Sequence, residues 1–219
     1  MSNSNTIIKK VIQTIEEEIV LGVLHPRERL VEDELLSRFE IKRHVARKIL
    51  EELEMMGLVE RRRNVGAIIK AYSAEEVEYL YSFRELLEVQ AAKMITFPIP
   101  SDQLEALISI QEKYDDAVEN GDLRKIFRLN VLFHQSFFGL CSNPFLVSTI
   151  IDHAQRAHSI RASTMSSSDL IQQARQEHWL IIDTLKNGDR EKLIELCRSH
   201  LTPSKEAYIR SANLRNHFV

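Results

Sequence analysis

The sequence predicts a mainly α-helical protein with two domains, at residues 1–72 and 73–219. Three observations lead to this fold class. Apolar residues recur every three or four positions through most of the chain, which is the spacing of a helix with one buried face. Residues 58–71 depart from that spacing and contain two short β-type runs around the turn Arg63-Asn64-Val65-Gly66. After Tyr72 the helical spacing continues with few glycines, which favours an antiparallel all-α bundle of six or seven helices.

The N-terminal domain is expected to contain three helices followed by a small β-hairpin. Gly22 ends the first helix and Gly57 ends the third, since glycine readily adopts the left-handed conformation that follows many helices. The expected elements are Thr6–Leu21, a short helix that carries Leu35, Leu36 and Phe39, a third helix at Lys42–Met56, and strands at Leu58–Arg62 and Gly66–Ala71. This order of elements is that of a winged helix-turn-helix.

The third helix separates apolar from basic residues. At 100° per residue, one side is apolar and the other carries Arg43, His44, Arg47 and Lys48 near the N-terminus of the helix. The apolar set is Val45, Ala46, Ile49, Leu50, Leu53 and Met56. Packing on the apolar side would leave the basic side chains exposed at the end that a recognition helix inserts into the DNA major groove. The pattern therefore predicts a DNA-binding domain.

The second domain is predicted to consist of helices separated by short turns. Ser73 is a suitable N-cap for the first of them, with Glu76 at the capping-box position. Pro203 is expected to kink or split the last one. The expected helices are Ala74–Ile95, Ser101–Asn120, Leu123–Cys141, Pro144–Met165, Ser168–Asn187 and Arg190–Ser211.

Composition narrows the class of protein. With 44% hydrophobic and 28% charged residues among 219, the chain can bury two cores and keep a polar surface. It has no apolar stretch long enough to span a bilayer, and its N-terminus lacks the apolar core of a secretion signal, so we expect a cytoplasmic protein and no membrane partner. Cys141 and Cys197 cannot form a disulfide framework and are expected to be buried thiols. The net charge of −3 is an average, and local charge governs DNA binding.

Residues 22–70 are similar to the DNA-binding domain of the GntR family of bacterial transcription regulators. In that family a leucine and a proline precede the second helix, two arginines lie on the third, and L-E-x-x-G-L-V leads to a wing glycine. The matching residues are Gly22, Leu24, Pro26, Leu30, Leu35, Arg43, Arg47, Leu50, Leu53, Glu54, Gly57, Leu58, Val59 and Gly66. Lys42, Val45 and Lys48 replace the usual serine, proline and glutamate, and Asp33 stands where some relatives have a DNA-contacting arginine. The operator sequence is therefore not carried over from any relative.

Each candidate DNA contact has an alternative as a solvated surface residue. Arg43 and Arg47 are one turn apart, and an arginine can donate two hydrogen bonds to a guanine. His44 and Lys48 suit base or phosphate contacts, and Lys42 adds phosphate attraction. Gly66 would allow a tight wing turn near the minor groove. The hairpin residues expected to touch phosphates are Arg61, Arg62 and Arg63. Nearby glutamates partly offset this charge, so we expect DNA affinity to require two copies of the domain.

The bundle resembles the FCD class of effector domain in the same family. The match rests on Arg84-Glu85-Leu86-Leu87-Glu88 with Ala91-Ala92, Phe133-His134, Asn143-Pro144-Phe145-Leu146, Glu177-His178 with Gly188-Asp189, and Ser199-His200-Leu201. Metal-binding members of the class use an aspartate, a histidine four residues later, and two further histidines. The resemblance implies a divalent metal ion, Zn²⁺ or else Ni²⁺ or another transition ion, held by Asn130, His134, His178 and His200.

Two features of this implied site have alternatives. Asn130 replaces the aspartate, and as a neutral amide it binds metal more weakly, so a lower affinity is expected. The histidines can instead be polar core residues hydrogen-bonded to one another or to water. The resemblance also implies that Arg84 holds a small carboxylate effector through paired hydrogen bonds, whereas its alternative partner is Glu88 one turn later. Further residues expected near this pocket are His153, Arg156, His158 and Arg161, and Trp179 is expected in the core.

The sequence thus predicts a regulator of transcription rather than an enzyme. A homodimer would place two winged domains on the half-sites of an imperfect palindromic operator in double-stranded DNA, and binding of a small carboxylate would change their spacing. Repression is the default in the family. A helical metalloenzyme is a second class, although the Glu-x-x-His pairs of di-iron bundles do not occur at these histidines. An architectural DNA-binder without sequence preference is a third.

Overall fold

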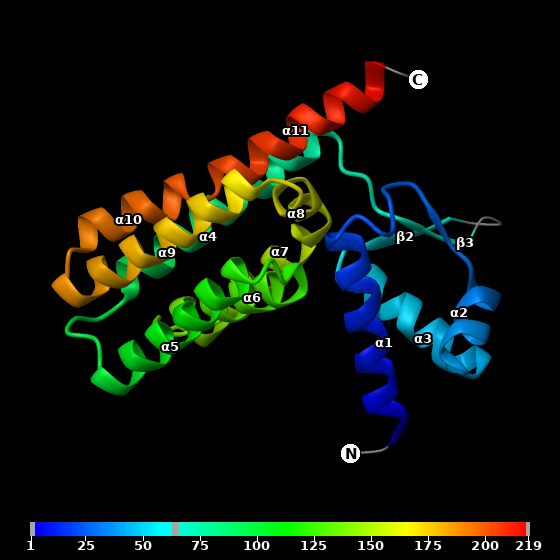
Figure 1. Ribbon diagram of the computed structural model, residues 1–219, viewed down its shortest axis with the longest axis horizontal. Coiled ribbons are helices and arrows are strands. Elements are labelled where there is room, and N and C mark those ends of the chain that lie inside the picture. Colours follow the sequence, from blue (N-terminus) through cyan, green and yellow to red (C-terminus); the bar gives the residue numbers. More distant parts are fainter. Residues whose placement is uncertain (1–2, 63–65, 218–219) are drawn as a thin grey trace. The chain divides into compact units, whose positions relative to one another are not determined.

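The computed structural model describes residues 3–62 and 66–217, and the chain divides into two compact units. The first unit comprises the chain up to Tyr72 together with Gln155–Ala162, and the second comprises Ser73–Ala154 and the chain from Ser163 onward. Figure 1 shows both, coloured along the sequence. Each unit has its own hydrophobic core. The mainly helical fold class predicted from the sequence is confirmed.

Up to Tyr72, the described part of the first unit contains three helices and a small antiparallel sheet. Its elements are α1 (Asn3–Val20), β1 (Arg29–Leu30), α2 (Glu32–Phe39), α3 (Arg43–Met55), β2 (Val59–Arg62) and β3 (Gly66–Ile69). The strand order is β1-β3-β2, and in the hairpin Val59 lies opposite Ile69 and Arg62 opposite Gly66. The sequence did not predict β1, because a strand of two residues has no alternation to detect.

The core of the first unit determines which side of α3 stays outside. Ala46, Ile49 and Leu53 are fully buried and pack in one cluster with Ile15 of α1 and Leu58. Burying an aliphatic side chain of this size stabilises a fold by about 1.5–3 kcal/mol. Since several such side chains lie on one face of α3, the helix cannot rotate without exposing them, and its other face is held toward solvent.

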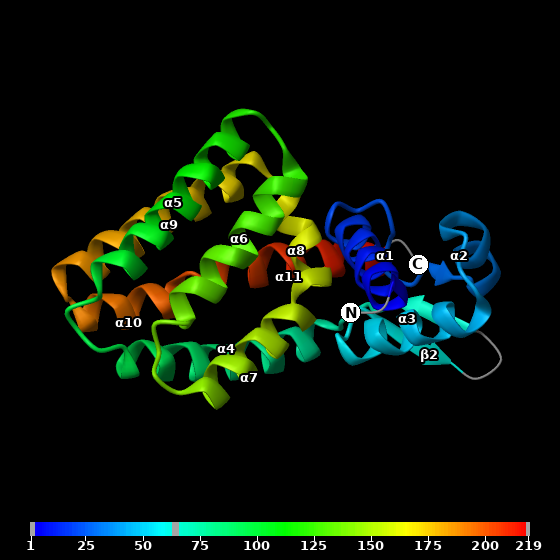
Figure 2. The ribbon, with the colours of Figure 1, turned by 90° about the horizontal axis from the view of Figure 1, so that it is seen from below.

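The second unit is a helical bundle. Its elements are α4 (Ala74–Met94), α5 (Ser101–Glu119), α6 (Leu123–Phe138), α7 (Pro144–Arg156), α8 (His158–Met165), α9 (Ser168–Asn187), α10 (Arg190–Ser199) and α11 (Thr202–His217), although residues 155–162 of α7 and α8 belong to the first unit. Neighbouring helices form a closed ring in the order α4, α6, α5, α9, α10 and again α4. Figure 2 shows α5 and α9 of this ring side by side. Residues on the inner faces of α6, α9 and α10 therefore converge.

The start of the bundle follows the predicted capping box. The Ser73 hydroxyl oxygen accepts a hydrogen bond from the Glu76 amide at 3.1 Å, and the Ser73 amide donates to the Glu76 carboxylate at 2.8 Å. Such a cap contributes about 1 kcal/mol to helix stability.

Two predicted helices are each divided in the structure. The chain breaks near Leu201, and Pro203 lies in the first turn of α11, where the missing amide of proline costs nothing. The single helix expected at Pro144–Met165 was wrong, because the chain breaks at Ala157 between α7 and α8. No glycine or proline marks that break. It lies within Gln155–Ala162, where His158 Nδ1 is 2.8 Å from Glu16 Oε1 of α1.

Within the described residues, the structure contains no helix that is long and apolar enough to cross a bilayer.

Candidate functional site

The N-terminal half of α3 presents a basic surface. Its exposed residues are Lys42, Arg43, His44, Arg47 and Lys48. The side chains of Arg43 and Arg47 are 60% and 59% exposed, one helical turn apart, on the side opposite the buried face. Groups in this position can enter a DNA groove without any rearrangement of the core.

Two acidic residues at the N-terminus of α2 hold these arginines. Glu32 lies between them, with Oε1 3.7 Å from Arg43 Nε and Oε2 3.5 Å from Arg47 Nε. Asp33 Oδ1 accepts a hydrogen bond from Arg43 Nη2 at 3.0 Å. A bidentate contact with guanine needs two donors of one guanidinium. Arg43 must therefore share or release Asp33 when it contacts a base. Glu32 contacts Arg47 at Nε, so the two Nη groups of Arg47 can contact a base without loss of that ion pair.

The wing adds further cations. Arg61 and Arg62 are exposed on β2, with Arg61 Nη1 3.6 Å from a Glu51 oxygen and Arg62 Nε donating to Glu60 at 2.8 Å. Arg63, the third predicted phosphate contact, lies outside the described residues. Gly66 begins β3 with φ +95°, a conformation that residues with a Cβ rarely adopt. Glycine is favoured there by its backbone conformation and not by lack of space, because a Cβ built on Gly66 meets no atom within 4 Å.

Inside the second unit three histidines from different helices meet. His134 comes from α6, His178 from α9, and His200 from the C-terminal end of α10. One ring nitrogen from each can be chosen so that all three lie within 4.8 Å of one another. Nε2 of His134 and Nε2 of His200 lie 3.1 Å apart. The ring of His178 stacks on Phe133 with centroids 3.9 Å apart.

Two acceptors contact the outer nitrogens of this cluster. His200 Nδ1 contacts the Glu177 carboxylate in a close hydrogen bond, and His178 Nδ1 lies 2.9 Å from Gln111 Oε1. Burial opposes ionisation of Glu177, but the hydrogen bond and charge of His200 outweigh it and lower the pKa of the carboxyl. Glu177 is therefore an anion beside His200. An acceptor on the outer nitrogen of a histidine leaves the inner nitrogen to bind a metal ion.

The donor set fits a divalent transition ion. Zinc–nitrogen distances of about 2.0–2.1 Å in a tetrahedron separate two nitrogens by about 3.3 Å. The His134–His200 pair already matches that separation, and closing the full 4.8 Å cluster requires a contraction of only about 1.5 Å. Asn130 lies one turn before His134 on α6, and its buried Nδ2 has no hydrogen-bond partner among the described residues. The amide of asparagine can turn by 180°, so this position can also present an oxygen.

Arg84 pairs with Glu88, the partner that the sequence offered as the alternative to an effector. The residue is buried on α4, and its Nε and Nη2 atoms lie 3.1 and 2.9 Å from the same oxygen of Glu88. Its guanidinium carbon also lies 5.0 Å from the ring centroid of Tyr81. Burial favours the neutral guanidine, but Glu88 and Tyr81 outweigh it and raise the pKa of Arg84. Its role in binding an effector stays a prediction.

The remaining candidates do not join the histidine cluster. Arg156, His158 and Arg161 fall in the segment that belongs to the first unit. His153 Nδ1 lies 2.8 Å from the Thr149 carbonyl of its own helix. Trp179 packs against the hydrophobic core of the second unit, as predicted.

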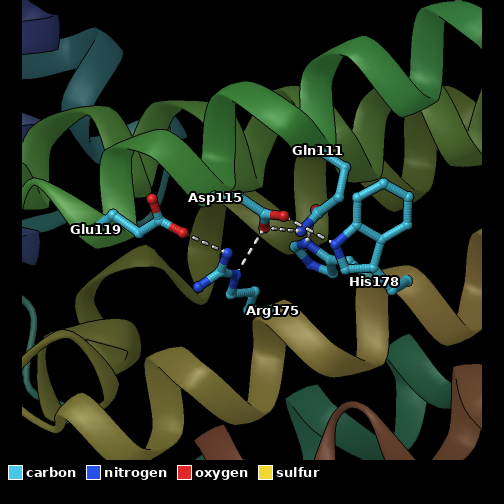
Figure 3. Close-up of polar contacts among 6 residues, drawn as sticks. Gln111, Asp115, Glu119, Arg175 and His178 are labelled. Atoms are coloured by element: carbon cyan, nitrogen blue, oxygen red, sulfur yellow. Dashed lines mark hydrogen bonds and ion pairs between the residues drawn. The ribbon is translucent and has the colours of Figure 1, made fainter.

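Gln111 and Glu177 contact the histidines directly, but neither was identified as a site residue from the sequence. Figure 3 shows Gln111 of α5 between His178 and Asp115, with Arg175 and Glu119 beside them. Gln111 was detectable only as a polar residue in an apolar helical stripe, between Leu107 and Tyr114. Glu177 precedes His178 directly, but contacts a different histidine, His200.

Comparisons with known proteins agree with both parts of the fold. The family described as "Bacterial regulatory proteins, gntR family" matches residues 7–69, and the "FCD domain" family matches residues 79–203. A probable D-xylose utilization operon transcriptional repressor of Paenarthrobacter nicotinovorans is 26% identical over 208 residues, which cover 93% of this chain and 88% of the relative. The uncharacterized HTH-type transcriptional regulator YdhC of Bacillus subtilis is 25% identical over 178 residues, covering 81% and 80%. The solved structure of McbR/YncC of Escherichia coli superimposes with a TM-score of 0.80 at 17% identity, covering 96% of this chain and 99% of that one.

Proposed function

Because the chain belongs to the GntR family of bacterial transcription regulators and carries an FCD domain, we propose that it is a repressor that releases DNA in response to a small carboxylate. The relatives are transcription regulators, and one is named a repressor of a sugar-utilization operon. A regulator of bacterial genes acts where the chromosome lies, so we propose a cytoplasmic location.

The observation that carries this proposal is the pair Arg43 and Arg47. They stand exposed one turn apart on α3, whose opposite face is locked in the core. We assign base contacts in the major groove to these two residues and to His44. Phosphate contacts are assigned to Lys42, Lys48 and the wing arginines, including Arg62 and Arg63, with Gly66 shaping the wing.

A second copy of the chain is the proposed partner on the operator. Tyr79, Phe83 and Leu86 occupy one face of α4 at helical spacing and are 66%, 41% and 65% exposed. Phe145 of α7 is also exposed, and Phe83 contacts His153 of that helix. An apolar face of this kind is unusual on a monomer and suits an interface between identical subunits. Two winged domains joined in this way would occupy the two half-sites of an imperfect palindrome.

The bundle is proposed to hold a divalent ion through His134, His178 and His200, with Asn130 as a weaker fourth ligand. Zn²⁺ is the first candidate, and Ni²⁺ suits the same imidazole donors. When bound, the ion supplies an electrophilic centre that attracts a carboxylate oxygen. The chain's own contribution is to hold the imidazole rings: Glu177 accepts from His200, and Phe133 restricts the ring of His178. Arg84 is the proposed second contact for the effector, through donors that Glu88 does not occupy.

The test is a selection of the full-length protein against random 30-base-pair duplexes, with the bound fraction sequenced after each round. An enriched imperfect palindrome with G-containing half-sites supports the proposal. Acetate, succinate and citrate are then added with and without Zn²⁺, and at least one is expected to weaken binding to the enriched duplex. Binding without enrichment would identify an architectural protein instead, and failure to bind any duplex would refute the proposal.

A further inference from the structure

Gln111 is a buried polar residue whose side-chain amide has a defined orientation. It and His178 are both fully buried, on α5 and α9, and Gln111 Oε1 lies 2.9 Å from His178 Nδ1. A buried amide must satisfy both its oxygen and its nitrogen, because an unpaired polar group costs about 1–3 kcal/mol. The contacts of the amide nitrogen therefore decide which end of the amide faces the imidazole.

Asp115 determines the orientation of this amide. Gln111 Nε2 donates a hydrogen bond to Asp115 Oδ1 at 2.8 Å, one turn along α5. An ionised carboxylate can only accept, so the nitrogen of the amide must face Asp115 and the oxygen must face His178. Asp115 is itself held, since Oδ1 accepts from Arg175 Nε and Oδ2 from Trp179 Nε1, both at 2.9 Å. Figure 3 shows this series of contacts from Glu119 and Arg175 to His178.

The direction of the amide fixes the proton on His178. Because Gln111 Oε1 only accepts, Nδ1 carries the proton and Nε2 carries the lone pair. The stacking of the ring on Phe133, at 14° between planes, restricts its rotation. In the neutral ring, Nε2 is thereby the nitrogen that can bind an ion.

We propose that the series Arg175–Asp115–Gln111 is the device that makes His178 a metal ligand, with Gln111 as its positioning residue. This inference rests on the proposed metal site. The acceptor on His178 is the neutral amide of Gln111, whereas the acceptor on His200 is the carboxylate of Glu177. A carboxylate partner makes a histidine the stronger donor, and an amide partner orients it without adding charge.

The inference is tested first without metal or substitution. Long-range ¹H–¹⁵N correlation spectra of the unaltered, metal-free protein report which ring nitrogen of His178 is protonated. The expected result is that the neutral ring carries its proton on Nδ1. A dominant Nε2–H form would overturn the inference, whatever the protein does with metal.

The second test compares Gln111→Met with Gln103→Met. Methionine keeps the length of glutamine but accepts no strong hydrogen bond, and Gln103 is an exposed residue of the same helix. Zn²⁺ affinity, measured by competition with a chromophoric chelator, is expected to fall about 10- to 100-fold in Gln111→Met and to stay unchanged in Gln103→Met. The His178 spectrum of Gln111→Met should show both tautomers.

The outcomes separate this inference from the proposed function. If the unaltered protein binds neither Zn²⁺ nor Ni²⁺, the metal site itself is refuted. If it binds Zn²⁺ and Gln111→Met binds it equally well, only the positioning role is refuted. Should Gln111→Met lose its helical circular dichroism, Asp115→Asn is used instead. That change lets the amide turn, and it should weaken Zn²⁺ binding by about two- to tenfold through partial loss of the tautomer; an unchanged affinity would again refute the role.

Discussion

Nε2 of His134 lies 3.1 Å from Nε2 of His200, although the residues are 66 positions apart on different helices. Without a metal ion, one nitrogen must donate and the other accept. In a neutral His200 ring whose proton faces the Glu177 carboxylate, Nε2 of His200 accepts and Nε2 of His134 donates. A cation between the two rings would replace a single hydrogen bond with two coordinate bonds.

Removing one of these rings should abolish tight metal binding. His200→Ala is expected to lose the stoichiometric Zn²⁺ of the unaltered protein, measured by elemental analysis after dialysis. At 100 times the dissociation constant, Zn²⁺ should stabilise the unaltered protein by about 2.7 kcal/mol and leave His200→Ala unaffected. His153→Ala is the control, because His153 contacts Thr149 and Phe83 outside the cluster. Equal Zn²⁺ stabilisation of all three proteins would rule out the histidine site.

Asn130→Asp should strengthen metal binding. Three neutral imidazoles and an amide leave both charges of the ion uncompensated, and an aspartate would neutralise one of them. We expect Zn²⁺ affinity to rise about tenfold, or ~1.4 kcal/mol, in titrations without carboxylate buffers. The affinity gain should shrink when acetate is present, because acetate supplies the same charge. Asn187→Asp adds the charge at the exposed end of α9 and should change nothing; a gain of equal size in that variant would contradict the explanation.

Arg84 and Glu88 are expected to stabilise the bundle as a pair. Both side chains are about 5% exposed, so Arg84→Met leaves a buried carboxylate without its cation and should cost about 3–5 kcal/mol of unfolding free energy in urea. The double variant Arg84→Met/Glu88→Met replaces the pair with apolar groups and should recover most of that loss. This double variant also separates structure from sensing. If it folds and still responds to carboxylates, Arg84 does not bind the effector.

Glu32 should set the balance between specific and non-specific DNA binding. Its carboxylate bridges Arg43 and Arg47, which restricts both side chains and opposes contact with phosphates. Glu32→Gln is expected to raise affinity for a random duplex severalfold and to reduce discrimination in favour of the enriched duplex, as measured by competition at two salt concentrations. Glu34→Gln removes the same charge from the same turn of α2, away from these contacts. Identical behaviour of the two variants would mean that only net charge matters.

The fold could be predicted where local pattern and packing agree. The apolar and basic faces of α3 follow from the order of Ala46, Ile49 and Leu53 against Arg43 and Arg47, and the structure buries the first set. The Ser73 cap was predictable because its partner lies three residues away. The break at Ala157 was not, since no glycine or proline marks it and the neighbouring His158 contacts Glu16, 142 positions earlier. Sequence spacing carries no information about such a contact.

For the candidate site, the three histidines could be predicted, but the orientation of their rings could not. His134, His178 and His200 followed from a resemblance, and the structure brings their ring nitrogens together. Gln111 could not be assigned, because a buried glutamine has no sequence signature and its meaning depends on Asp115, Arg175 and a histidine 67 positions away. Arg84 shows the opposite case. Its local partner, Glu88, was identifiable from spacing alone, and that contact is the one observed.

The most direct test of the account is the affinity of the enriched duplex for Arg43→Glu/Arg47→Glu, measured by fluorescence anisotropy. Each lost arginine–guanine contact should cost about 1–3 kcal/mol, so binding should weaken by at least about 30-fold. Lys93→Glu/Lys113→Glu changes two exposed lysines of the second unit by the same total charge and should bind nearly as well as the unaltered protein. Full affinity in the arginine variant, or an equal loss in the lysine variant, would contradict the assignment of α3 as the recognition helix.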